Sequence, residues 1–317
     1  MRRLAVIAAA LAGLGLAAPA VAEPTRVVPV VSEGRIVDLG VMTSRYASPR
    51  RVVVWLPEGY RETGPKYSVL YMHDGQNLFD NATAGYGREW QIDEVASRLM
   101  REGKMRPTIV VGIWNTPQRL RDYVPSRAFQ YLPPQYMDRV RGLYGGDPLS
   151  DGYLKFLVEE LRPQINKRFH VRTNRDDTVV MGSSMGALIS LYAINRYPRV
   201  FGGAGMVSTH WPLFLPKEGE KRSDEDVNTV ATAFERYLAP DLASPSGHRL
   251  YFDHGTETLD RHYAVYQQRI DRVVAARGYR LGSNWMVRSF PGQEHNEASW
   301  SSRVDIPLQF LLPPRRK

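Results

Sequence analysis

The sequence predicts an α/β fold in which a mainly parallel central sheet carries helices on both faces. From Tyr67 onward, short apolar runs alternate with amphipathic stretches, and no internal repeat or low-complexity linker separates them. One run passes through a glycine- and serine-rich turn directly into a helical pattern, VVMGSSMGALISLYAINRYP at residues 179–198. Ligands of such sheets bind beyond the carboxyl ends of the strands. We therefore expect the functional residues just after the strands.

Each element is predicted by its own hydrophobic pattern. The expected strands are RIVDLGV (35–41), RRVVVWLP (50–57), YSVLYMHDG (67–75), TIVVGIW (108–114), DTVVMG (177–182), GAGMVS (203–208), RLYFDHG (249–255) and NWMVRSFPG (284–292). The expected helices span residues 89–103, 151–169 with an interruption at Pro163, 185–198 and about 259–277. The first two strands precede the alternation, so they should form an antiparallel edge.

The N-terminus has the pattern of an export signal. Arg2 and Arg3 precede the apolar run LAVIAAALAGLGLAA, and small residues follow at Ala20, Val21 and Ala22. The expected domains are a signal peptide at 1–22 and one catalytic domain at 23–317, with a periplasmic or secreted location. The alternative is an uncleaved anchor, which fits less well because the run is rich in alanine, broken by glycines and barely long enough to span a membrane.

The composition is that of a globular protein without disulfides. Of the 317 residues, 43% are hydrophobic and 24% are charged, and none is cysteine. A thiol nucleophile and a zinc ribbon are thereby excluded. The formal charge of +9 falls to +7 once the two signal-peptide arginines are removed. We interpret this charge as a solvated basic face, and the alternative is a surface for anionic ligands or for an acidic cell envelope. No RNA- or DNA-binding pattern occurs, so we expect no nucleic-acid partner. The sequence does not indicate an oligomeric state.

The serine-rich turn fits the GxSxG pattern of a serine nucleophile. Gly182, Ser184 and Gly186 occupy its fixed positions between a strand and a helix. In this setting a sharp turn lifts the serine hydroxyl above the sheet, and larger flanking side chains would collide with the backbone. Ser184 is therefore the predicted nucleophile, and Ser183 is expected to be structural.

A serine nucleophile needs a histidine base and an acid, which in this sheet type follow it in the order serine, acid, histidine. His295 follows the last strand on a short loop ahead of a helix, where the base should lie. The acid should follow RLYFDHG, which leaves Glu257 and Asp260. We favour Glu257, because Asp260 is equally suited to cap the next helix. His254 also ends a strand and is a candidate pocket residue.

Two backbone amides should stabilise the oxyanion formed during acyl transfer. Met185 supplies one at the start of a helix, and Gly75 or Gln76 in YMHDGQNLFD supplies the other. His73 and Asp74 in the same stretch lack the spacing of a metal site. We expect no metal and no other cofactor.

Seven stretches together resemble the putative-esterase family of α/β-hydrolases, which includes esterase D-like and enterochelin esterase-like proteins. They are VVVWLPEGY, YSVLYMHDGQNLFD, VVGIWNT, RDYVPSR, VVMGSSMGALISLYAINRYP, YFDHGTETLD and GQEHNEASW. The resemblance implies an α/β-hydrolase fold with Ser184 as nucleophile and His295 as base. A common position for the acid in such folds, three residues after the strand-ending glycine, is Thr258 here. Known members cleave siderophore lactones, feruloyl and acetyl polysaccharide esters, and glutathione thioesters.

Two segments are expected to set specificity. Residues 115–150 form a connection rich in tyrosine, arginine and proline that is too long for a simple loop. The segment STHWPLFLPKEGEKRSDED follows another strand, and its charged half should be solvated. The candidate substrate-binding residues in the two segments are Arg119, Arg121, Tyr123, Arg127, His210 and Trp211.

The sequence thus predicts an exported, cofactor-free serine esterase acting on a small-molecule or polysaccharide ester. Short-chain, aryl or siderophore-type esters are favoured, with siderophore-type esters slightly ahead, because rings and guanidinium groups suit aromatic or anionic esters. The alternatives are an acyltransferase that uses the same three residues and a hydrolase-like binding protein without turnover.

Overall fold

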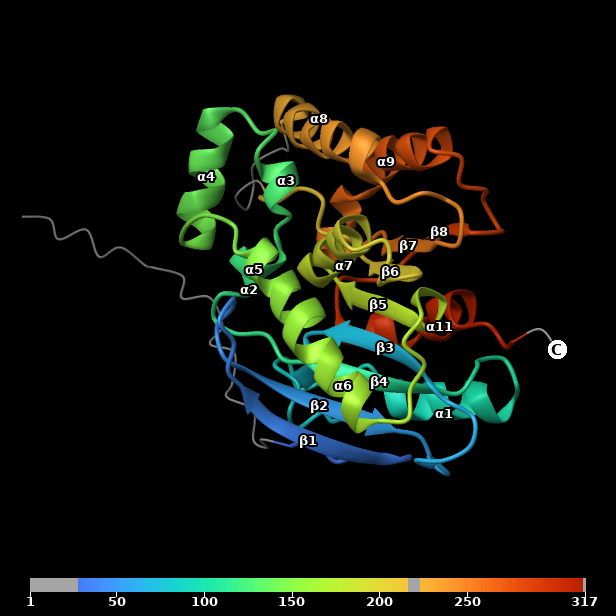
Figure 1. Cartoon of the computed structure of the whole chain (residues 1–317). Helices are drawn as coiled ribbons and strands as arrows, with labels where there is room; N and C mark the ends of the chain where they lie inside the picture. Colours follow the sequence, from blue (N-terminus) through green and yellow to red (C-terminus); the bar gives the residue numbers. More distant parts are fainter. Residues whose placement is uncertain (1–27, 216–222, 316–317) are drawn as a thin grey trace, which may run out of the picture.

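The central sheet runs through the whole molecule. A computed structural model describes residues 28–215 and 223–315, and within these residues the sheet has eight strands in the order β1-β2-β4-β3-β5-β6-β7-β8 (Figure 1). The strands are β1 (Arg35–Met42), β2 (Arg50–Leu56), β3 (Ser68–His73), β4 (Thr108–Ile113), β5 (Thr178–Ser183), β6 (Gly203–Val207), β7 (Arg249–Gly255) and β8 (Trp285–Phe290). All eight strands expected from the sequence are present.

The pairing of the strands agrees with the expected edge. β1 pairs antiparallel with β2, and β2 pairs antiparallel with β4, whereas every other neighbouring pair is parallel. The strand order reverses between β3 and β4, which follow one another in the chain while β5 lies on the other side of β3. The carboxyl ends of β3, β5, β6, β7 and β8 consequently meet along one edge of the sheet, where a site can form.

Helices cover both faces of the sheet (Figure 1). On one face, α1 (Ile92–Arg101) and α11 (Asp305–Leu311) bury their apolar side chains against the strands. The larger core lies on the other face, under α7 (Met185–Arg196), α8 (Asp224–Asp241) and α9 (Ala264–Ala276). Every residue of β3, β4, β5 and β6 is buried, as a sheet covered on both faces requires.

The helix expected at residues 151–169 is a composite. It comprises α5 (Ser150–Lys155), the π-helical stretch η2 (Phe156–Leu161) and α6 (Arg162–Arg168). Pro163 lies just after the π-helical stretch and has no N–H to close an ordinary helical hydrogen bond. The helix expected from residue 259 also begins differently, with the 3₁₀ turn η4 (Thr258–His262) ahead of α9.

Several elements are additional to the sequence prediction. The segment at 115–150 folds into α2 (Arg119–Tyr123), α3 (Ser126–Phe129) and α4 (Pro134–Tyr144). The 3₁₀ turns η1 (Gly75–Asn77) and η3 (Arg175–Asp177) and the helices α8 and α11 are also additional, whereas α10 (Glu297–Ser301) is the helix expected after His295. No side chain caps the start of α2, α3 or α4, so the usual capping signals are missing from their sequence.

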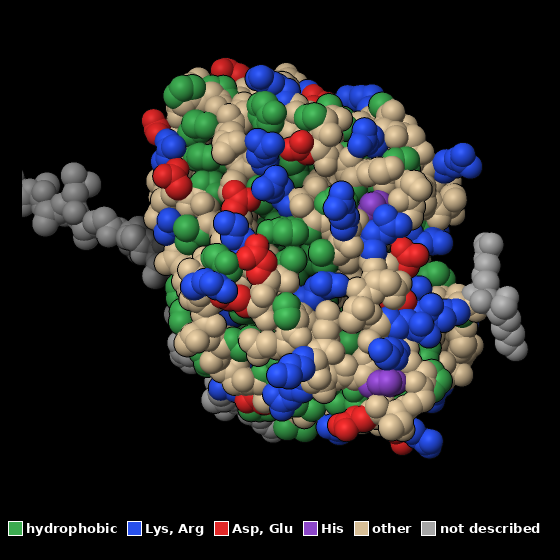
Figure 2. All heavy atoms as spheres, in the orientation of Figure 1, with side chains coloured by type: hydrophobic (Ala, Val, Ile, Leu, Met, Phe, Trp, Pro, Cys, Tyr) green, Lys and Arg blue, Asp and Glu red, His purple; other side chains and the backbone are tan. Residues whose placement is uncertain are grey.

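The predicted signal peptide and part of the predicted charged segment, residues 216–222, lie outside the described residues. Among the helices of 28–215 and 223–315, none combines the length and apolar character that crossing a bilayer demands. Figure 2 shows lysine and arginine side chains distributed over one whole face, with acidic groups between them. The excess positive charge is therefore spread out on this face.

Candidate active site

Ser184 occupies a strained turn between β5 and α7. Its backbone has φ 57° and ψ −121°, a conformation that non-glycine residues rarely adopt. The turn is tight: a Cβ at Gly182 would lie 2.8 Å from the carbonyl oxygen of Gly186. The Ser184 N–H donates to the Val207 carbonyl on β6 at 2.9 Å, which anchors the turn to the neighbouring strand. This is the geometry that the GxSxG pattern predicts.

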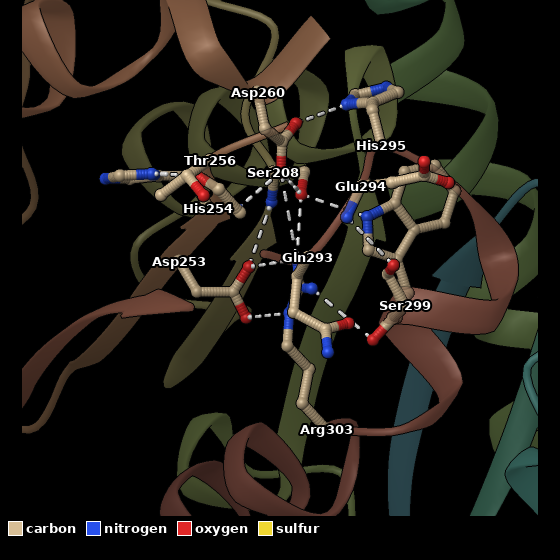
Figure 3. A network of polar contacts seen from close by, with 12 residues as sticks. Ser208, Asp253, His254, Thr256, Asp260, Gln293, Glu294, His295, Ser299 and Arg303 are labelled. Atoms are coloured by element: carbon tan, nitrogen blue, oxygen red, sulfur yellow. Dashed lines mark hydrogen bonds and ion pairs between the residues drawn. The ribbon is translucent and has the colours of Figure 1, made fainter. Parts of the chain in front are cut away.

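The structure places Asp260, and not Glu257, against His295. The His295 ring donates from Nδ1 to Asp260 Oδ1 at 2.6 Å, and both side chains are almost fully buried (Figure 3). Glu257 is exposed, and its carboxylate accepts from the Thr256 hydroxyl at 3.2 Å. The preference for Glu257 is therefore corrected by the geometry. Asp260 does not cap α9 either, since Tyr263 occupies that position.

Asp260 is held as an anion by donors on both of its oxygens. Its Oδ2 accepts from the Gly255 amide at 2.6 Å and from the Ser208 hydroxyl at 2.5 Å (Figure 3). Burial by itself would raise the pKa of Asp260, but the hydrogen bonds from His295, Ser208 and Gly255 bring it below its usual range. An ionised acid beside Nδ1 leaves Nε2 of His295 free to accept a proton.

The Ser208 hydroxyl is fixed by a buried polar network. It accepts from Trp300 Nε1 and from the Arg303 guanidinium, both at 2.9 Å. Arg303 also forms an ion pair with Asp253, and both side chains are buried (Figure 3). With both lone pairs of the hydroxyl engaged, its proton can go only to Asp260. The network therefore orients the acid.

A chain of contacts joins Ser184 to His295. The His210 amide donates to the Ser184 carbonyl at 3.2 Å, and the His210 ring contacts the Tyr263 hydroxyl at 2.7 Å. The Tyr263 ring in turn lies edge-on to His295, with 5.6 Å between ring centroids. Burial lowers the pKa of His210 to about 3, and the nearby His295 adds a smaller effect in the same direction. His210 is therefore uncharged and lines the site.

The predicted oxyanion donors lie on two adjoining segments. Met185 begins α7, and Gly75 and Gln76 begin η1, so these amides are in first turns, where N–H groups have no partner within the helix. A Cβ at Gly186 would lie 3.3 Å from Asp74 Oδ2, which shows how closely the two segments approach. A Cβ at Gly75 would lie 2.4 Å from the backbone of Gly112 on β4, so only glycine fits there.

The segment that carries Gly75 is held by a partly buried ion pair. Arg119 donates from Nε and Nη2 to the two oxygens of Asp74, at 2.7 and 2.8 Å. Asn115 adds a third hydrogen bond at 2.6 Å. Burial alone would raise the pKa of Asp74, but Arg119 and Asn115 bring it below the usual value. Asp74 is thus anionic in a left-handed backbone conformation (φ 55°) beside the oxyanion donors.

The other predicted substrate-binding residues already have partners within the protein. Tyr123 and Trp211 are buried in the core, at most 1% exposed. Arg121 donates to the Asp147 carbonyl and the Gln118 side chain, and Arg127 pairs with Asp241 on α8. Neither aromatic ring is accessible to a substrate.

The two remaining histidine candidates are structural. His254 is 8% exposed, and its Nδ1 contacts the Gly255 carbonyl at 2.6 Å. Burial lowers the pKa of His73 to about 3, and its Nδ1 contacts the Tyr153 hydroxyl at 2.7 Å. In the part of the chain that the structure describes, neither belongs to a group of three residues able to hold a metal ion.

Comparison with known proteins identifies the family. The family model described as Putative esterase matches residues 43–305. The chain belongs to the putative esterase family. The chain is 27% identical over 173 residues to the uncharacterized protein YbbA of Bacillus subtilis. That match covers 54% of this chain and 62% of the relative, so the chain spans less than two thirds of that relative's length.

Solved structures of α/β-hydrolase-type esterases share the fold of this chain. A ferulic acid esterase superposes with a TM-score of 0.61 at 17% identity, covering 88% of this chain and 98% of the other. The enterobactin esterase FES from Shigella flexneri superposes with a TM-score of 0.61 at 16% identity, covering 92% of this chain and 62% of the other. At these identities the likeness concerns the fold.

Sequence reasoning missed the residues that hold Asp260 in place. Ser208 directly follows β6 with φ 46°, a strand-end position that could have marked it as a candidate. Arg303 gave no signal, because it lies beyond the last strand and its partner Asp253 is 50 residues earlier in the sequence. Thr258 was noted only as a departure from the common pattern. Its hydroxyl oxygen accepts a hydrogen bond from the His295 amide at 2.8 Å.

Proposed function

We propose that this esterase hydrolyses carboxylic esters with Ser184 as nucleophile, His295 as general base and Asp260 as the acid that orients the base. The observation that supports this most is the 2.6 Å contact between His295 Nδ1 and a doubly anchored Asp260, on the same sheet edge as the strained Ser184. Among the described residues, Asp260 is the buried carboxylate that is hydrogen-bonded to His295. Serine, base and acid are the groups that acyl transfer requires.

The proposed reaction proceeds through an acyl-enzyme. His295 Nε2 takes the proton of the Ser184 hydroxyl as Oγ attacks the ester carbonyl, and the resulting oxyanion accepts hydrogen bonds from the amides of Met185 and of Gly75 or Gln76. The imidazolium then protonates the departing alcohol. His295 then takes a proton from a water molecule as the water oxygen attacks the acyl-enzyme. The imidazolium returns this proton to Ser184 Oγ as the bond to the acyl group breaks, which releases the acid and restores the enzyme.

The proposed substrates are short-chain, aryl or siderophore-type esters. The fold relatives support this, because one is a ferulic acid esterase and another was solved with enterobactin, and both compounds carry phenolic rings. Tyr123 and Trp211 give no support, since they are buried. The aromatic preference therefore depends on the comparisons more than on the predicted lining residues.

Two measurements test the proposal. We expect Ser184→Ala to lower kcat by about 10⁴- to 10⁶-fold in a folded protein and to abolish labelling by a fluorophosphonate. Across p-nitrophenyl acetate, butyrate and palmitate, methyl ferulate and a catecholate trilactone, kcat/KM should be lowest for palmitate. Full activity of Ser184→Ala would refute the mechanism, and a preference for palmitate would refute the substrate class.

We also propose that the protein is exported, cleaved after Ala22, and periplasmic or secreted. The motif of two arginines, an apolar run and small residues supports this. Intact-mass measurement of protein from the cell envelope should give a chain that begins at Glu23. A full-length mass in the membrane pellet would show an anchor instead.

A further inference from the structure

Three carboxylates meet at the beginning of α1. Glu89 lies just before the helix, and Asp93 and Glu94 lie in its first turn. Each side chain offers an oxygen, and these oxygens all lie within 4.8 Å of one another. No part of this cluster belongs to the proposed triad or to the predicted oxyanion amides.

One oxygen of each carboxylate is closed off from solvent and unpartnered. Asp93 is 0% exposed, and its Oδ1 accepts no hydrogen bond within the described residues. The same holds for Glu89 Oε2 and Glu94 Oε2, although these side chains are only partly buried. Buried carboxylate oxygens are costly to leave unpaired, and three together are more costly because their charges repel.

The Asp93 side chain is held in place by the segment that precedes β1. Its Oδ2 accepts from the amides of Ser32 and Glu33, at 2.9 and 3.2 Å. Glu89 is positioned through its own amide, which donates to Asn81 Oδ1 at 2.9 Å. The unpartnered oxygens therefore belong to a largely preformed arrangement.

We propose that Glu89, Asp93 and Glu94 bind a divalent cation, with Ca²⁺ preferred to Mg²⁺. Carboxylate-only ligand sets suit hard cations. The three oxygens lie within 4.8 Å of one another, and this upper bound does not choose between the two ions by size. A set of three carboxylates favours Ca²⁺, because Mg²⁺ usually binds through one or two carboxylates and keeps several waters. Water molecules would complete its coordination.

The cation would stabilise the junction between three segments. Asp93 lies in α1 and accepts a hydrogen bond from the segment before β1. Glu89 lies at the end of the stretch of chain that begins at the predicted oxyanion amides in η1. Gln91 accepts from the Ser301 hydroxyl at 3.0 Å, which connects this junction to α10, the helix that follows His295. The proposed cation is therefore structural, and the esterase reaction involves no metal step.

Calcium titration of the mature protein tests the site. After EDTA treatment and dialysis near neutral pH, CaCl₂ and MgCl₂ are titrated calorimetrically, and Tm is measured with each salt. Glu89→Gln and Glu94→Gln each remove one charged ligand, whereas Glu62→Gln removes an exposed carboxylate elsewhere and serves as the matched control. Asp93 is left intact because it anchors Ser32 and Glu33.

We expect millimolar CaCl₂ to raise Tm by several degrees in wild type and in Glu62→Gln. Kd for Ca²⁺ should rise at least tenfold in Glu89→Gln and Glu94→Gln. Without cation these two variants should be at least as stable as wild type, because repulsion is relieved. Absence of heat and of a Tm shift in wild type, or an unchanged shift in Glu94→Gln, would refute the site. A response to MgCl₂ alone would refute the preference for Ca²⁺.

Discussion

Replacing Asp260 by asparagine tests the proposed acid most sharply, because the two side chains have the same shape. In the native site three donors converge on the carboxylate: His295 Nδ1 on one oxygen, and the Gly255 amide and the Ser208 hydroxyl on the other. Asparagine offers one oxygen and one NH₂ group. Whichever way its amide is oriented, the NH₂ group faces a donor.

The two orientations have different consequences. If the oxygen faces His295, the Gly255 amide loses its acceptor inside the protein, at a cost of about 1–3 kcal/mol. If the oxygen faces Gly255, the NH₂ group donates to His295 Nδ1, and the ring proton moves to Nε2. The second orientation keeps more hydrogen bonds, so we expect it to dominate. His295 then cannot accept the proton of Ser184.

We therefore expect Asp260→Asn to lower kcat for p-nitrophenyl acetate by about 10³- to 10⁴-fold, with KM little changed. Tm should fall by only a few degrees, since one buried hydrogen bond is exchanged for another. Glu257→Gln is the matched control and should keep near wild-type kcat, because Glu257 is exposed. More than a tenth of wild-type kcat in folded Asp260→Asn, or an equal loss in Glu257→Gln, would refute the assignment.

Two further predictions concern charges near the site. Arg119→Met removes the cation beside Asp74 and leaves it the Asn115 hydrogen bond. Because Arg119 is partly exposed, we expect a loss of about 1–3 kcal/mol in the free energy of unfolding, and adding Asp74→Asn should partly restore it. A double variant no more stable than Arg119→Met would refute the pairing. Burial, with a contribution from Asp74, raises the pKa of Glu297 from 4.5 to about 7. The folded protein therefore binds this proton more tightly than the unfolded chain does, and stability is lost as the pH rises from about 4.5 to 7. Glu297→Gln should therefore gain roughly 1–3 kcal/mol over wild type at pH 8 and little at pH 4, measured by urea unfolding, and a gain that does not change with pH would contradict this origin.

The sheet was predictable because each strand is a short apolar run with its own boundaries. Strands such as β4 and β5 are buried along their whole length, so their composition alone marks them. The nucleophile was predictable for a related reason: the tight turn at Ser184 admits only small neighbours at Gly182 and Gly186, and this steric limit appears in the sequence. Local constraints of this kind leave a local signature.

The partner of His295 was not predictable, because it is decided by a turn and not by a residue type. Thr258 adopts φ 47° and begins a 3₁₀ turn, which carries Asp260 inward while Glu257 stays at the surface. Glu257 and Asp260 are three residues apart, and both are acidic, so no pattern of polarity separates them. The same limit applies to Ser208 and Arg303, whose roles arise only where distant strands and helices meet.

The arginines were expected to meet the substrate, and their contacts change that expectation in a definite way. Arg119 has 28% of its side chain exposed, but both oxygens of Asp74 already occupy its guanidinium in a bidentate pair. An anionic substrate at this position would have to displace a carboxylate whose desolvation has already occurred, which opposes binding. Arg119 therefore contributes by holding Asp74 and the adjoining oxyanion amides in place. Selectivity for anionic substrates requires arginine or lysine side chains that are not already paired with a carboxylate.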